Sequence, residues 1–86
     1  MRYHNSKSRA WKQSEITRIK TESGCVDCGY NRCSQALEFD HVGEKNFTIA
    51  TSVVSNRPWQ AVLDEIAMCE VVCANCHRER TVSRRE

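Results

Sequence analysis

CANCHRER, residues 73–80, is the stretch on which the interpretation of the whole chain depends. It begins with C-x-x-C-H, which is the attachment sequence for a c-type haem, but the same letters also place two thiolates beside an imidazole. A second C-x-x-C pair, Cys25 and Cys28, precedes it. A single covalent haem has no use for this second pair, whereas a tetrahedral zinc ion takes four thiolates from two such pairs.

The chain is short, and its composition calls for a covalent or metal crosslink. It has 86 residues, enough for one domain, and only two Phe, two Tyr and two Trp contribute large side chains. A domain of this size gains modest stability from apolar packing alone. The six cysteines are the obvious source of the missing stability, as zinc ligands or as three disulfides.

The N-terminal sequence favours reduced cysteines. Residues 1–20 contain no continuous apolar segment of the kind found in a signal peptide, and no later stretch reaches the length of a membrane span. We therefore expect a cytoplasmic protein, where disulfides and covalent haem are both uncommon. This expectation favours zinc over the two alternatives.

Four cysteines form the predicted zinc site: Cys25, Cys28, Cys73 and Cys76. A site with four thiolates has no open coordination position, so the zinc is expected to be structural. Cys33 and Cys69 remain, and we expect both to be thiols that bind no metal, Cys69 as a small buried apolar side chain.

The first half of the chain predicts a helix, a cysteine turn and a strand. Residues 8–22 read as a helix capped by Ser6 or Ser8 and ended by the Ser-Gly pair at 23–24, and Gly29 suits a turn between metal ligands because it tolerates positive φ. Residues 36–42 alternate as a strand, 43–46 form a turn and 47–51 read as a short extended piece.

The second half predicts a helix, a strand and a helix. From about Pro58, apolar residues at 59, 62, 63 and 66 follow helical spacing, and we interpret this stripe as core. Residues 70–72 are β-prone, and 74–84 have the composition of a final helix.

Basic residues gather at both ends of the chain, although the formal net charge is only +2. The first twenty residues contain one acid, Glu15, and six basic residues: Arg2, Lys7, Arg9, Lys12, Arg18 and Lys20. The C-terminal group is Arg78, Arg80, Arg84 and Arg85. Such a distribution fits either a solvated surface or contact with a polyanion such as nucleic acid.

Three residues have the chemistry of a hydrolytic centre. Asp40 and His41 leave the predicted strand together, and His77 follows a zinc ligand directly, which restricts its position. A carboxylate and an imidazole suit a hard divalent cation, while a second imidazole can take a proton from water near neutral pH. This division of roles fits metal-assisted phosphodiester hydrolysis.

The stretch LEFDHV, a helix, and then CEVVCANCHRERT together resemble the HNH endonucleases, a zinc-containing branch of the His-Me finger nucleases with small phage and bacterial members. The similarity covers about residues 25–81. It implies an α+β fold with a zinc-stapled ββα-metal core in residues 25–86, an inserted helix, and a basic N-terminal helical segment in residues 1–24.

The resemblance also implies site roles. Asp40 and His77 would bind a catalytic divalent metal such as Mg²⁺ or Mn²⁺, His41 would be the general base, and the four paired cysteines would bind structural Zn²⁺. The family's middle Asn, which commonly braces the general base, falls at Met68 here, so Asn75 is the proposed replacement and Asn46 and Asn56 are other candidates.

The substrate implied by the resemblance is DNA, nicked or cut on both strands. Expected contacts to the phosphate backbone come from basic residues of both ends: Arg9, Lys12, Arg78, Arg80 and Arg84. A homodimer or a phage packaging protein would be a partner for double-strand cutting, in the cytoplasm of a bacterial host. The alternative from another class is a zinc-finger-like DNA-binding module without catalysis.

Overall fold

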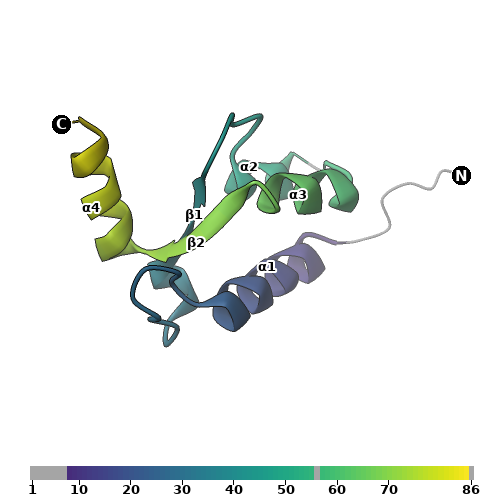
Figure 1. The fold of residues 1–86 in the computed structure, drawn as a ribbon. Coiled ribbons are helices and arrows are strands. Elements are labelled where there is room, and N and C mark those ends of the chain that lie inside the picture. The colour runs from purple at the N-terminus through teal and green to yellow at the C-terminus, as the bar shows by residue number, and fades with distance from the viewer. Residues whose placement is uncertain (1–7, 56, 86) are drawn as a thin grey trace, which may run out of the picture.

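The computed structural model describes residues 8–55 and 57–85. Within them the chain folds as a small α+β structure with four α-helices and a two-stranded antiparallel sheet (Figure 1). In chain order the elements are α1 (Arg9–Ser23), a 3₁₀ turn (Ser34–Ala36), β1 (Leu37–His41), α2 (Ile49–Val54), α3 (Trp59–Ile66), β2 (Cys69–Cys73) and α4 (Ala74–Arg85). Arg2, Ser6, Lys7 and Asn56, named above, lie outside the described residues.

Helix α1 begins and ends where its capping residues predict. The Ser8 side chain accepts a hydrogen bond from the Trp11 backbone N–H at 3.0 Å, which satisfies one of the amides left open at the start of the helix. At the other end Gly24 has φ of 66° and donates its N–H to the Lys20 carbonyl, a conformation that favours glycine. Ser8 is therefore the cap, as one of the two predicted positions.

The two strands are far apart in sequence and pair directly. Leu37 lies opposite Cys73, Asp40 opposite Glu70, and His41 opposite Cys69. Helices α2 and α3 form the connection between the strands, and α4 continues directly from β2. The strand, strand and helix order predicted from the sequence is confirmed, but the segment between the strands contains two helices where one was predicted.

Helix α2 corrects one prediction. Residues 47–51 were expected to be extended, but Ile49 begins a six-residue helix that buries Ile49, Ser52 and Val53. The i, i+3, i+4 spacing of these three residues is the helical signal that short length and β-branched composition obscured. The helix is stabilised by burial of one face rather than by propensity.

Two apolar clusters hold the elements together. One, the cysteine-end cluster, contains buried Cys25, Leu37, Val71, Val72 and Cys73. The other, the helical-end cluster, contains buried Ile16, Ile49, Val53 and Val62. Phe39 packs against both clusters, so this one side chain of β1 joins the two ends.

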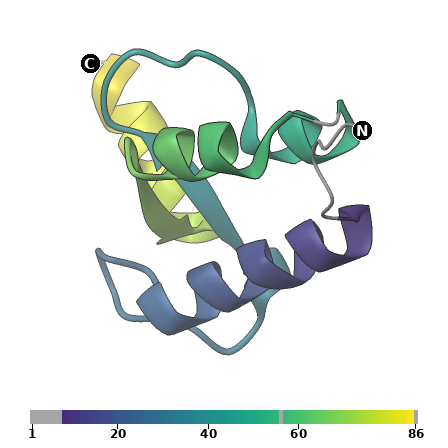
Figure 2. The same cartoon turned by 90° about the vertical axis from the view of Figure 1, so that its right-hand side faces the viewer.

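The helices occupy opposite ends of the two-stranded sheet. Figure 1 shows α4 at one end of the sheet and α1, α2 and α3 at the other, and Figure 2 shows α1 on one side of this end with α2 and α3 on the other. Trp11 and Trp59 meet edge to face with ring centroids 5.2 Å apart, which connects α1 to α3. The described helices include none with the length and apolar character needed to cross a membrane.

Candidate functional site

The four predicted zinc ligands come together. Their Sγ atoms all lie within 4.8 Å of one another, and those of Cys28 and Cys73 are 3.8 Å apart. A tetrahedral zinc ion with Zn–S bonds of about 2.3 Å requires sulfur atoms about 3.8 Å apart. Among residues 8–55 and 57–85 this is the one group of three or more Cys, His, Asp or Glu side chains close enough to share an ion. The geometry therefore fits a structural zinc site.

Local backbone geometry forms the first half of this cluster. Gly29 has φ of 85° and donates its N–H to the Cys25 carbonyl at 2.7 Å, which closes the turn between the first two ligands. The Val26 N–H donates to the Val71 carbonyl at 2.9 Å, which attaches the turn to β2. The turn therefore lies beside the strand that supplies Cys73, and the positive φ predicted at Gly29 is confirmed.

The protonation chemistry of the cluster favours a bound cation. Burial acts to raise the pKa of Cys25, but hydrogen bonds with the backbone of Cys73, Cys28 and Asp27 outweigh it and lower that pKa to about 6. A hydrogen bond with the Cys73 thiol, and then burial, raise the pKa of Cys76 well above its usual value. Four thiolates cannot therefore coexist here without positive charge between them, which a metal ion would supply.

The two remaining cysteines lie away from the cluster. Cys33 is exposed, and Cys69 is half-buried with its thiol donating to the Glu65 carbonyl at 3.3 Å. Burial, and then the negative charge of Glu65, raise the pKa of Cys69 to about 11. A thiol held protonated is a poor metal ligand, which fits its expected role as a packed side chain.

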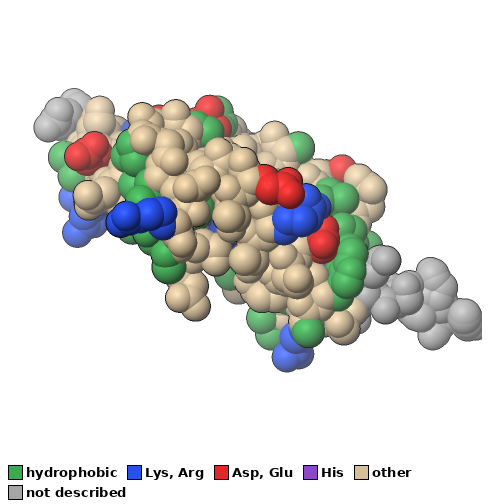
Figure 3. Space-filling model, turned by 90° about the horizontal axis from the view of Figure 1, so that it is seen from below, with side chains coloured by type: hydrophobic (Ala, Val, Ile, Leu, Met, Phe, Trp, Pro, Cys, Tyr) green, Lys and Arg blue, Asp and Glu red, His purple; other side chains and the backbone are tan. Residues whose placement is uncertain are grey.

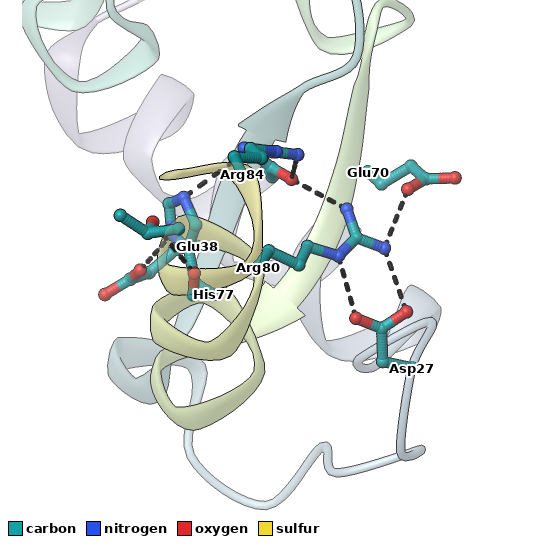
Figure 4. A network of polar contacts seen from close by, with 8 residues as sticks. Asp27, Glu38, Glu70, His77, Arg80 and Arg84 are labelled. Carbon is teal, nitrogen blue, oxygen red and sulfur yellow. Dashed lines mark hydrogen bonds and ion pairs between the residues drawn. The ribbon is translucent and has the colours of Figure 1, made fainter. Parts of the chain in front are cut away.

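His77 lies on the first turns of α4 between two carboxylates of β1. Its Nδ1 is 2.5 Å from Glu38 Oε1, and its Nε2 is 3.5 Å from Asp40 Oδ1 (Figure 4). Because an ionised carboxylate only accepts hydrogen bonds, Nδ1 is the donor to Glu38 and Nε2 faces Asp40. Glu38, which a sequence reading would take for a solvated strand residue, is half-buried and hydrogen-bonded to His77.

Asp40 is buried and paired with two arginines of α4. Arg80 Nη1 is 2.7 Å from Asp40 Oδ2, and Arg84 Nη2 is also 2.7 Å from that oxygen. The hydrogen bond from Arg84 is the main reason that the pKa of Asp40 falls to about 2, although burial opposes the fall and Arg80 assists it. The carboxylate is therefore ionised and already neutralised by side chains of the chain itself.

Arg80 connects three segments through their acids. Its guanidinium makes two hydrogen bonds to Asp27 in the cysteine turn, at 2.8 and 2.9 Å, and reaches Glu70 of β2 at 2.9 Å (Figure 4). Asp40 and Glu70 are directly opposite on the paired strands, where like charges repel. Arg80 offsets this repulsion and fixes α4 against the sheet.

His41 takes part in a different network from Asp40. Successive side chains of a strand point to opposite faces, so His41 lies on the face of Leu37 and Phe39. Its Nε2 is 2.8 Å from Glu65 Oε2 of α3, and the Asn46 backbone N–H and side-chain amide donate to the two oxygens of the same carboxylate at 3.0 Å each. Sequence reasoning missed Glu65, whose only signal is an acid beside the apolar stripe of α3.

The bracing residue proposed for His41 is elsewhere. Asn75 is exposed on α4 and lines a 250 Å³ hollow with Tyr30 and Ala36. Among the described side chains, His41 is hydrogen-bonded to Glu65 and not to Asn75. Asn46, another candidate, is hydrogen-bonded to Glu65, which is in turn hydrogen-bonded to His41.

The predicted DNA contacts differ in their availability. Lys12 is only 1% exposed and donates to the Arg57 carbonyl at 2.9 Å, so it cannot reach a phosphate on the surface. Arg80 and Arg84 are occupied by carboxylates, whereas Arg9 and Arg78 are exposed and form no ion pair with another described residue. On the face in Figure 3 the described basic side chains are scattered among acids and form no continuous patch.

Comparisons with known proteins add no relative: no protein-family model matches the chain, and neither the curated proteins nor the solved structures compared with it give a significant match. The resemblance to HNH endonucleases therefore depends on the motif residues themselves.

Proposed function

We propose that this protein is a metal-dependent DNA endonuclease of the HNH type. The observation that carries the proposal is the 3.5 Å separation of His77 Nε2 and Asp40 Oδ1. His77 lies on α4 directly after Cys76, a member of the cysteine cluster. A carboxylate and an imidazole this close, brought together from positions 40 and 77, form half of a binding site for a hard divalent cation.

The donor pair fits such a cation. Adjacent ligands in an octahedral Mg²⁺ or Mn²⁺ shell, each about 2.1 Å from the ion, are about 3 Å apart, close to the present separation. Water and a substrate phosphate would complete the shell. When bound, the ion would neutralise charge on the scissile phosphate and the leaving oxygen.

The chain's own residues prepare His77 for this role. Glu38 accepts a hydrogen bond from Nδ1, which leaves the Nε2 lone pair directed at Asp40. An imidazole bound to a carboxylate through its other nitrogen is the usual arrangement at metal sites, where it fixes the ring and increases its basicity. Cys76, the proposed zinc ligand that precedes His77, also restricts the backbone position of His77.

His41 is the proposed base that activates water, and Arg78 is a proposed phosphate contact. Arg78 is exposed and lines a 270 Å³ hollow with His77 and Thr81, on the side of α4 where the substrate backbone would pass. Arg9, on α1, is a second proposed phosphate contact. Binding through phosphates should weaken steeply as salt concentration rises.

A supercoiled-plasmid assay tests the proposal. Zinc-loaded protein with Mn²⁺ or Mg²⁺ should convert supercoiled DNA to the nicked form, and EDTA should prevent it. His41→Ala should bind DNA with unchanged affinity and cut about 100-fold or more slowly, the usual contribution of a general base. Folded, zinc-loaded wild type that binds DNA but never nicks it in either metal would contradict the enzyme proposal.

One observation favours the alternative, a zinc-stapled DNA-binding module without catalysis. Asp40 is held by Arg80 and Arg84, so a cation must compete with two guanidinium groups for it. A binding module would keep these ion pairs on DNA. The nicking assay, run beside a gel-shift measurement on the same sample, separates the two functions.

A further inference from the structure

The buried carboxylate of Glu65 is a polar group that the family resemblance does not assign. Its side chain is 3% exposed, and hydrogen bonds come to it from the backbone and side chain of Asn46 and from His41. A buried carboxylate costs free energy unless its oxygens are satisfied, and here three donors satisfy them. The same arrangement fixes the orientation of the His41 ring.

The hydrogen bonds determine which nitrogen of His41 carries the proton. Hydrogen bonds from Asn46, first from its side chain and then from its backbone, lower the pKa of Glu65, so the group is ionised and can only accept. Both hydrogen bonds from Asn46 leave no freedom for the carboxylate to turn away. The Nε2 of His41 must then be the donor, and the lone pair of the neutral ring lies on Nδ1.

The surroundings of the imidazole fit this assignment. The His41 side chain is 12% exposed, and His41 lines a cavity of about 280 Å³ between α1, β1 and α2. Lys20, Lys45 and Glu38 line the same cavity, so its lining carries charges of both signs. The ring is thus held by α3 through Nε2 and also borders this cavity.

We propose that Glu65, fixed by Asn46, is the positioning residue for the general base His41, and takes the place of the Asn that the chain lacks at residue 68. This inference rests on the proposed nuclease function. It assigns the base to Nδ1, because the hydrogen bond from Nε2 to the α3 carboxylate fixes the ring orientation and the tautomer. No new bond is formed by Glu65 itself.

The matched variants are Glu65→Gln and Asp64→Asn. Both replace a carboxylate of α3 by an amide, but Asp64 is exposed and accepts a hydrogen bond within its own helix, from Gln60 at 2.9 Å. We expect Glu65→Gln to lower kcat for plasmid nicking about 10- to 100-fold with KM unchanged, and Asp64→Asn to retain wild-type rates. Zinc content and the circular dichroism melting curve show whether each variant is folded.

A second readout does not depend on cutting. Long-range ¹H–¹⁵N correlation spectra of the zinc-loaded protein report which imidazole nitrogen is protonated, with the His41→Ala spectrum used for assignment. Wild type and Asp64→Asn should show the Nε2–H form of His41, and Glu65→Gln a mixture of both forms. If Glu65→Gln does not fold, Asn46→Ala replaces it, with an expected decrease in kcat of about 2- to 10-fold.

The outcomes separate this inference from the proposed function. Wild-type nicking with no loss in the folded Glu65 or Asn46 variant, or a His41 tautomer that these variants leave unchanged, overturns the role of Glu65 and leaves the nuclease intact. Absence of nicking in wild type overturns the nuclease and with it any catalytic role for Glu65, even where the tautomer spectrum shows the hydrogen bond.

Discussion

The two ends of the molecule are stabilised by different physics. At the cysteine end, α4 and the cysteine turn are held to the sheet by four thiols and by ion pairs of Arg80. At the helical end, α1, α2 and α3 meet through four buried apolar side chains and a Trp–Trp contact. His77 belongs to the first end and His41 to the second, so a site that uses both depends on the sheet that joins them.

Removal of zinc should have the largest effect and tests whether the two ends are independent. Structural zinc contributes about 10–16 kcal/mol of apparent free energy in small peptides, more than the total stability of a typical small domain. We expect chelation to unfold both ends, because the helical-end cluster is too small to fold alone. Circular dichroism of the EDTA-treated protein measures this, with zinc content determined on the same sample.

Two exposed cysteines provide the control for that experiment. Cys28→Ser should lose zinc and unfold at ordinary temperature, whereas Cys33→Ser should keep both zinc and the wild-type melting temperature. A chelated protein that retains its helical signal and a cooperative transition would contradict this view and show that the helical end folds without the metal.

Substitution of Phe39 should have the next largest effect, because this ring packs against both clusters. Phe→Ala in a core costs about 3–5 kcal/mol, and for this half-buried ring we expect about 2–4 kcal/mol in the free energy of unfolding. The ring also lies 5.5 Å from the Lys20 ammonium, a favourable contact that the substitution removes. Urea denaturation of the zinc-loaded protein measures the loss.

Phe47→Ala is the matched control. Phe47 is half-buried and stacks with Arg57 at 4.2 Å, but it belongs to neither apolar cluster. Its replacement should cost about 1–2 kcal/mol and leave a single transition. If Phe39→Ala costs no more than Phe47→Ala, the sheet does not couple the two ends through this side chain.

The sequence predicted those features that local patterns specify. Capping residues located α1, alternation located β1, and the paired C-x-x-C motifs located the cysteine cluster. The capping and alternation signals each lie within a few neighbouring residues. The cysteine signal is recognisable because paired cysteines in a reduced protein most often bind metal. Helix α2 was missed because its helical spacing covers only one turn and a half.

The charged partners of the site could not be predicted, because they meet only after folding. Glu65 is 24 residues from His41, Glu38 is 39 residues from His77, and Arg84 is 44 residues from Asp40. Each of these acids and bases has an ordinary surface pattern in the sequence. Only the strand register and the packing of α3 and α4 on the sheet determine which of them face one another.

The smallest predicted effect concerns Arg84, and it tests whether the charged cysteine end is also a metal site. The Arg84 side chain is 54% exposed and is paired with the buried Asp40, for which a divalent cation would have to compete. Arg84→Gln removes one competitor, so it should tighten Mn²⁺ binding about 1.5- to 5-fold. Electron paramagnetic resonance titration of free Mn²⁺ with zinc-loaded protein measures this affinity without any DNA.

Arg85→Gln is the matched control. It removes the same charge one residue further along α4, from a side chain without an ion pair to a described residue, and should leave the affinity close to wild type. Equal gains in the two variants would attribute the effect to net charge, and tight Mn²⁺ binding that persists in Asp40→Asn would place the cation away from His77.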